Sequence, residues 1–196
     1  MKSSSSLLIL PLAVIALQCC RPTDRAEEMG DTTTATDHTV VGVPEAPDRK
    51  TLENEIQTAM FIEKAALGGM MEIALGKLAR EKARNLRVKD FGKLMELDHA
   101  RINAGLKALS SSKGLKFPVS LPAKDLEQIR EMSRMETEHF EKLYLKMMVE
   151  DHNKDIELFS GAGKSPDVLV SDFAGKYLPV LERHLVKALE VREAIR

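Results

Sequence analysis

From Thr51 to the end of the chain, apolar positions recur every three or four residues, as they do along one face of an α-helix. No segment shows the alternation of a strand. The pattern predicts long helices at about 51–84, 86–111, 134–161 and 165–195, and a short helix at about 124–132. Four long amphipathic helices that form two hairpins favour an all-α fold, a four-helix bundle with a short extra helix between helices 2 and 3.

Capping and breaking residues set the expected helix ends. Asn85 can end the first long helix and cap the second, and two prolines mark the connection at 113–123 as irregular. Glycines at 161 and 163 end the third long helix. Ser165 and Pro166 then suit the N-cap and the first position of the last helix.

A turn of 100° per residue predicts which side chains face the interior. We centre the buried faces of the four long helices on Leu67, Met95, Tyr144 and Leu181 in turn. On the first helix this face collects large apolar residues, and Glu72 lies off it. The side chains assigned to this face are Leu52, Ile56, Met60, Leu67, Met70, Met71, Ala74 and Leu78.

Acids and histidines occur at several of the expected interior positions. The dipeptide Asp-His appears twice, at 98–99 and at 151–152, and the last helix directs His184 inward. Asp155 also falls near the middle of a buried face, whereas His139 falls on a polar face. Such groups are costly to bury unless they pair with one another or bind a metal ion.

Distance from each turn predicts which residues share a level. Counting from Asn85 places Asp98 opposite Met71 or Glu72. Counting from a turn near Gly163 places Asp151 opposite about residue 175, with His184 about two helical turns further along. We therefore expect the polar residues in two layers rather than at a single site.

Composition narrows the classes of function. The chain has 196 residues, with 29 basic and 30 acidic side chains that are interspersed, so charge gives no reason to expect nucleic acid as a partner. Both cysteines lie in the first 20 residues, so none is available in the helical domain as a nucleophile or ligand. No serine or threonine motif with a placed base supports nucleophilic catalysis.

The N-terminal segment is expected to target the chain to the cell envelope. Residues 7–17 are an apolar run too short to span a bilayer, and they are followed by Cys19 and Cys20. Residues 1–20 resemble a bacterial lipoprotein signal, with either cysteine as the lipidated residue; an ordinary secretory signal is the alternative. Residues 21–50 are polar and are expected to form a disordered tether, ahead of the helical domain at 51–196.

Four segments resemble a bacterial family of unknown function, the family numbered 4142. They are FIEKAALGGMMEIALGKLAREKA, VKDFGKLMELDHARINAGLKALSSSKG, YLKMMVEDHNKDIELF and DFAGKYLPVLERHL. The resemblance implies a ferritin-like bundle in the cell envelope, with no established activity. It also implies a pattern of an Asp-His on helix 2, an Asp-His on helix 3 and a His on helix 4, which this chain meets with Asp98, His99, Asp151, His152 and His184.

Three interpretations of the polar positions stay open. The first is a hydrogen-bonded network that fixes helix register, in a non-enzymatic binding or structural module with a role in envelope stress. The second is a site for iron, zinc or manganese, or a redox site, built from the five Asp and His residues of the family pattern. The third uses the neighbouring methionines and histidines for copper. Glu96-x-x-His99 is the single inward Glu-x-x-His pair, so the usual di-iron ligand set is not met. The expected partner is the membrane, through a lipid anchor.

Overall fold

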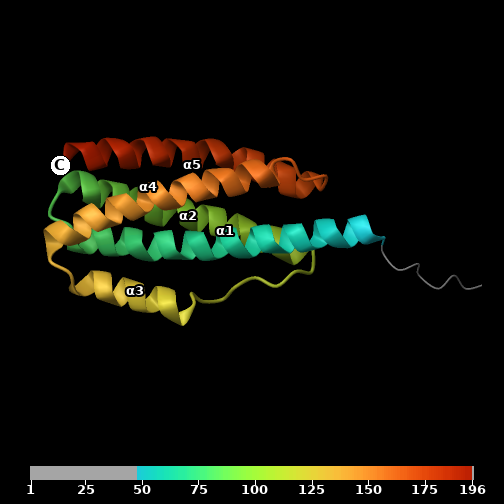
Figure 1. Cartoon of the computed structure of the whole chain (residues 1–196), viewed down its shortest axis with the longest axis horizontal. Coiled ribbons are helices and arrows are strands. Elements are labelled where there is room, and N and C mark those ends of the chain that lie inside the picture. Colours follow the sequence, from blue (N-terminus) through green and yellow to red (C-terminus); the bar gives the residue numbers. More distant parts are fainter. Residues whose placement is uncertain (1–47, 196) are drawn as a thin grey trace, which may run out of the picture. The chain divides into compact units, whose positions relative to one another are not determined.

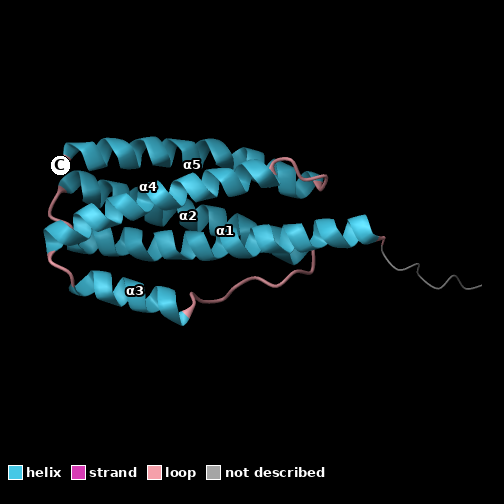
Figure 2. Ribbon diagram, in the orientation of Figure 1, coloured by secondary structure: helices cyan, strands magenta, loops and turns pink. Residues whose placement is uncertain are grey.

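The computed structural model describes residues 48–195, which form five α-helices and no strand (Figure 2). The expected all-α class is confirmed, and every helix end lies within three residues of its expected position. Among the described residues, no helix is long and apolar enough to cross a membrane. The helices are α1 (Arg49–Lys82), α2 (Leu86–Ser112), α3 (Ala123–Arg134), α4 (Thr137–Ala162) and α5 (Val168–Ala194).

The four long helices lie side by side as two antiparallel hairpins (Figure 1). The hairpin of α1 and α2 packs on the hairpin of α4 and α5 through contacts of α1 with α4 and of α2 with α5. Helices α2 and α4 run in the same direction, so the connection between them returns along the length of the domain (Figure 1). Helix α3 belongs to this connection and packs against the outside of α1.

The caps explain most helix boundaries. Asn85 caps α2 as expected, because its side chain accepts a hydrogen bond from the backbone N–H two residues later. Gly163 ends α4, also as expected. The expected start of α5 at Ser165 is wrong. Asp167 is the N-cap, and the preceding residues form a loop, so α5 begins at Val168.

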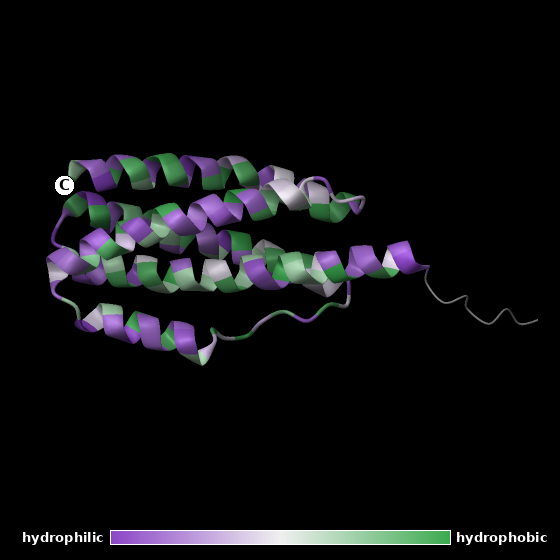
Figure 3. Cartoon of the chain, viewed as in Figure 1, coloured by the Kyte–Doolittle hydropathy of each residue, from purple (hydrophilic) through white to green (hydrophobic). Residues whose placement is uncertain are grey.

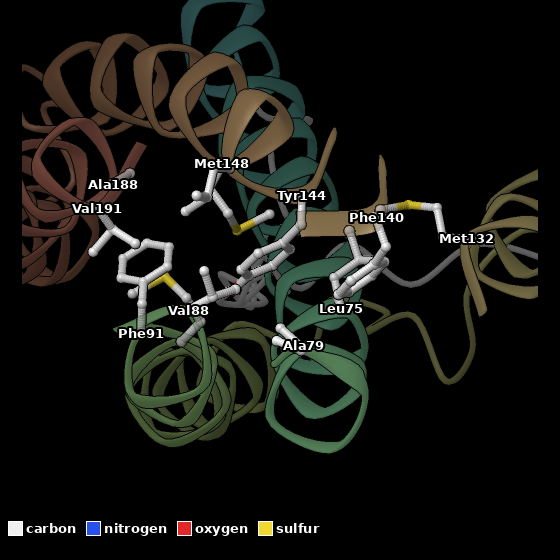
Figure 4. Close-up of a cluster of buried hydrophobic side chains, with 13 residues drawn as sticks. Leu75, Ala79, Val88, Phe91, Met132, Phe140, Tyr144, Met148, Ala188 and Val191 are labelled. Atoms are coloured by element: carbon white, nitrogen blue, oxygen red, sulfur yellow. The ribbon is translucent and has the colours of Figure 1, made fainter. Parts of the chain in front are cut away.

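The apolar interior consists of two clusters at different levels of the domain. Cluster 1 lies near the turn between α1 and α2, and Figure 4 shows Met132 of α3 directed toward Phe140 at its edge. Cluster 2 lies toward the turn between α4 and α5. Hydrophilic residues dominate the first turns of α1 and most of α3 (Figure 3). Cluster 1 includes Leu75, Val88, Phe91, Met95, Tyr144 and Met148, and cluster 2 includes Phe61, Ile62, Ile102, Leu106, Phe159 and Leu181.

Six of the ten buried residues of α1 are alanine, glycine or threonine, and none of the residues expected on this face is among the ten, so that expectation is wrong. Leu52, Ile56 and Met60 are each more than 40% exposed. The reason is the close approach of α1 to α2. A Cβ atom at Gly76 would lie 2.6 Å from the backbone oxygen of Gly92, and a Cβ at Gly92 would lie 2.6 Å from that of Gly76. The buried face comprises Thr58, Phe61, Ile62, Ala65, Ala66, Gly69, Glu72, Leu75, Gly76 and Ala79.

Glu141 of α4 links the turn between α1 and α2 to the second hairpin by hydrogen bonds. Its Oε1 atom accepts hydrogen bonds from the backbone N–H groups of Arg84 (2.6 Å) and Asn85 (2.8 Å), and the side chain is buried. Glu141→Ala leaves both donors without an acceptor and is expected to lower the free energy of unfolding by about 1–3 kcal/mol. Urea denaturation measures the loss. Glu141→Gln keeps an acceptor oxygen and should lose less; equal stability of the alanine variant and the wild type would contradict this role.

Candidate functional site

A layer of polar side chains separates the two apolar clusters, with one buried residue from each long helix. These are Glu72 on α1, His99 on α2, His152 on α4 and His184 on α5, and none is more than 2% exposed. Along each helix the polar residue stands between members of cluster 2 and members of cluster 1. The packing on both sides therefore holds four polar groups at one level of the interior.

The three histidine rings face one another across this layer. Their ring centroids lie 5.3–5.4 Å apart in all three pairs. One nitrogen from each ring lies within 4.8 Å of the corresponding nitrogens of the other two, a spacing that could hold a metal ion. The three rings thus converge on one point from α2, α4 and α5.

Each histidine has an acceptor at one of its two ring nitrogens. His99 Nδ1 lies 2.8 Å from Glu72 Oε2. His152 Nδ1 lies 2.8 Å from the carbonyl oxygen of Met148, one turn earlier on α4, and 3.2 Å from Glu72 Oε1. His184 Nε2 lies 3.0 Å from Asp98 Oδ2. Four carboxylate or carbonyl contacts therefore set the orientation of the three rings.

These acceptors determine which nitrogen of each neutral ring carries the proton. A carbonyl or carboxylate oxygen accepts a hydrogen bond, so the nitrogen beside it carries the hydrogen and the other nitrogen has an unprotonated lone pair. The other nitrogens are Nε2 of His99, Nε2 of His152 and Nδ1 of His184. All three are buried and have no hydrogen-bond partner. The same is true of both carboxylate oxygens of Glu72, whose contacts with His99 and His152 are short but do not meet the geometry of a hydrogen bond. The layer therefore holds three lone pairs that no donor satisfies.

Burial keeps the imidazoles neutral near pH 7. It lowers the pKa of His99 and of His184 to about 4, and the nearby carboxylates offset only part of this. Burial also lowers the pKa of His152, while Glu72 raises it and the other two histidines lower it further. A neutral imidazole is the form that binds a metal ion, so no proton has to leave the rings first.

Two further groups lie beside Glu72. Burial raises the pKa of Glu72 to about 7 and the pKa of Asp155 to about 8. The interaction between the two side chains lowers the pKa of Glu72 and raises the pKa of Asp155, so Asp155 holds its proton more strongly than Glu72. Burial and the charge of Glu72 together raise the pKa of Tyr144 well above its ordinary value. Of these three groups, Glu72 therefore loses its proton most readily.

The structure brings together three of the five residues expected to bind metal. His99, His152 and His184 meet at one level, so the expected division into two layers is wrong. Residue 168 lies midway between His152 and His184, and the α4–α5 hairpin is centred there rather than at Gly163. The loop before α5 causes this shift, because it delays the start of the helix.

The two aspartates of the Asp-His pairs lie at the edge of the layer. Asp98 is 21% exposed and contacts Arg101 as well as His184. Asp151 is 30% exposed and forms an ion pair with Lys154. On a face centred on Tyr144, Asp151 would lie nearer the middle than His152, but the buried face of α4 is centred on Met148, which reverses the two. His139 is exposed, as expected. Cys19 and Cys20 lie outside the described residues.

Glu72 is the site residue that the face analysis missed. It falls at the middle of the buried face of α1, which contains several alanines and glycines and none of the residues expected there. The count from the turn at Asn85 did carry a signal, since it placed Glu72 or Met71 opposite Asp98. The side chain that Glu72 meets on α2 is the next residue, His99.

Residues 42–191 match the family DUF4142, described as a domain of unknown function. The match includes all four long helices except the final residues of α5, and it contains every residue of the polar layer. We find no match to this chain among curated proteins or among solved structures.

Proposed function

The chain belongs to the DUF4142 family, and we propose that it binds one divalent transition-metal ion, zinc in the first instance, through His99, His152 and His184. The donors would be Nε2 of the first two and Nδ1 of the third. This is the metal-binding alternative among the interpretations of the sequence. A purely structural network would not explain the three ring nitrogens that have no hydrogen-bond partner.

The main feature of the layer is the set of three unpartnered lone pairs. Buried polar atoms in proteins nearly always have a hydrogen-bond partner, and a group without one costs about 1–3 kcal/mol. A complete structural network would give every buried ring nitrogen a partner. Here each ring contacts an acid or a backbone carbonyl through one nitrogen, and its other nitrogen has no partner. A cation at their centre satisfies all three at once.

The outer contacts support the same proposal. Histidines that bind metal ions commonly donate their second ring N–H to a carboxylate or a backbone carbonyl, which fixes the tautomer and makes the ligand nitrogen more basic. All three rings have this arrangement. The carboxylates of Glu72 and Asp98 would also balance the two positive charges of the ion, as buried charges require.

The donor set favours zinc, copper or iron over manganese. Imidazole nitrogen suits zinc, copper, iron and nickel, whereas manganese prefers carboxylate and water oxygen. Three neutral imidazoles leave one position of a tetrahedral ion for a fourth ligand. The architecture that we propose around this ion is a ferritin-like four-helix bundle, supported by two antiparallel hairpins and the long return connection between α2 and α4.

Metal analysis of the purified protein tests the proposal. Protein prepared without chelator and incubated with equal Zn²⁺, Fe²⁺, Cu²⁺ and Mn²⁺ is expected to retain about one ion per chain after desalting, with zinc favoured over manganese. The matched variant carries His99→Ala, His152→Ala and His184→Ala, and the control carries His139→Ala on the exposed face of α4. Retention by the control and loss by the triple variant support the site. Equal retention by all three proteins contradicts it.

We also propose that the chain is an envelope lipoprotein whose anchor is Cys19 or Cys20. The support is the apolar run at 7–17 directly ahead of the two cysteines. Bacteria that express the chain and are fed a clickable palmitate analogue should label it. Changing the acceptor cysteine to serine should abolish the label, and changing the other cysteine should leave it. Equal labelling when both cysteines are replaced would refute the lipid anchor.

A further inference from the structure

We propose that the pocket between α1, α3 and α4 is the port through which a hydrated divalent cation enters the polar layer. This inference rests on the proposed metal site, because it concerns how an ion reaches it. The three histidines are buried, so an ion cannot bind to them directly from solvent. The ion must therefore pass between helices to reach the histidines, and three observations indicate that it does so at this pocket.

The first observation is the charge of the pocket. It has a volume of about 780 Å³, and acidic side chains outnumber basic ones around it. A cleft lined by one sign of charge concentrates ions of the other sign and raises their association rate. The acids are Asp125, Glu150, Asp151, Asp155 and Glu157, and the bases are Lys64 and Lys154, of which Lys154 pairs with Asp151.

The second observation is a series of polar groups that leads from this pocket to the histidines. Asp155 lines the pocket, and it lies close enough to Glu72 for the charge of Glu72 to raise its pKa. Glu72 in turn contacts His99 at 2.8 Å and His152 at 3.2 Å. An ion that passes Asp155 therefore meets Glu72 next, and Glu72 contacts two of the three histidines.

The third observation is Gly68, which lines the pocket on α1. A glycine inside a helix costs about 1 kcal/mol relative to alanine, so it usually has a packing reason. Gly69, Gly76 and Gly92 have one, because a Cβ atom at each would collide with α2 or α1. Gly68 has no such constraint. The nearest atom to its Cβ position is Asp155 Oδ1, at 3.6 Å. Because Gly68 has no side chain, the space in front of Asp155 stays open.

A side chain placed at this glycine tests the port. Gly68→Leu fills the space above Asp155, and Gly175→Leu makes the same change on the exposed face of α5, where a Cβ meets nothing within 4 Å. The probe is Zn²⁺ alone, exchanged with a chromogenic chelator in stopped flow, using full-length protein and subtracting the triple-histidine variant. A port affects entry and exit alike. Gly68→Leu should therefore slow uptake and release by the same factor, about tenfold or more, and leave the dissociation constant unchanged.

Charge reversal provides a second test that leaves the interior intact. Glu150→Lys with Glu157→Lys reverses two exposed charges at the pocket, and Glu182→Lys with Glu190→Lys does the same on α5. At low salt the first pair should slow zinc uptake about three- to tenfold, and the second pair should slow it less. The difference should shrink as salt screens the charges.

The possible results test the proposed port and the proposed metal site independently. Wild-type protein that takes up no zinc overturns both proposals. Zinc uptake that is lost in the triple-histidine variant but proceeds at wild-type rates in Gly68→Leu overturns the port and leaves the metal site standing. A change in the dissociation constant without a matched change in both rates also overturns the port, because it shows an effect on the bound state. Slowing by Gly68→Leu and by the α4 charge reversal, with both controls near wild type, supports it.

Discussion

Saturation with Zn²⁺ is expected to raise the free energy of unfolding by about 4 kcal/mol once free zinc reaches about 1,000 times the dissociation constant. The three ligand nitrogens come from helices that are distant in sequence, so the unfolded chain presents no comparable site. Zinc also supplies the partner that the three lone pairs lack. Urea denaturation with and without zinc measures the gain, which should grow with the logarithm of the free zinc concentration.

Single substitutions should reduce the stabilisation by zinc to different extents. His152→Ala removes a ligand and should abolish the stabilisation by zinc, while His139→Ala should preserve it. Asp98→Asn keeps all three ligands and weakens the contact that orients His184, so it should lower zinc affinity about 10- to 100-fold without abolishing binding. Equal stabilisation of the wild type and His152→Ala would show that zinc binds elsewhere.

Gly76→Val is expected to destabilise the domain by about 3 kcal/mol or more, independently of any metal ion. A Cβ atom at this position would lie 2.6 Å from the Gly92 carbonyl oxygen and 3.0 Å from the backbone nitrogen of Glu96. Both are backbone atoms of α2, so no side-chain rotation relieves the collision. The two helices would have to separate, and the clusters on both sides of the layer would lose contacts.

The matched control for this prediction is Gly175→Val. That position lies on the exposed face of α5, and its Cβ meets no atom within 4 Å. Valine there is expected to be neutral or slightly stabilising, because glycine is the poorer helix former. Urea midpoints of the two variants, compared at equal slopes, measure the difference. Similar midpoints would mean that α1 and α2 do not approach as closely as the structure indicates.

The helices themselves could be predicted because their apolar period is long and regular and their ends carry ordinary caps. The buried face of α2 was also predictable, since large residues such as Phe91 and Met95 occupy it. On α1 the same reasoning selected the wrong side. Hydrophobic size identifies a buried face only where helices pack through their side chains. Where backbones touch, as at Gly76 and Gly92, the contact residues are small, and large residues such as Leu52 and Ile56 lie outside.

The candidate site was predicted in part for related reasons. The helical period placed His99 and His184 toward the interior, and both are buried there. The period alone could not show that His184 lies level with His152. The loop before α5 sets that register, and helical periodicity does not predict the conformation of a loop. Glu72 was missed together with the buried face of α1. Three-dimensional packing was needed to show that one acid connects two of the three histidines.

The most direct test of the central claim is an anomalous difference map from crystals of the zinc-loaded protein, with data collected on both sides of the zinc absorption edge. The account predicts one peak in the polar layer, about 2.0–2.1 Å from Nε2 of His99, Nε2 of His152 and Nδ1 of His184. A fully loaded crystal with no peak among the three rings, or with its peak only at surface carboxylates, would contradict it.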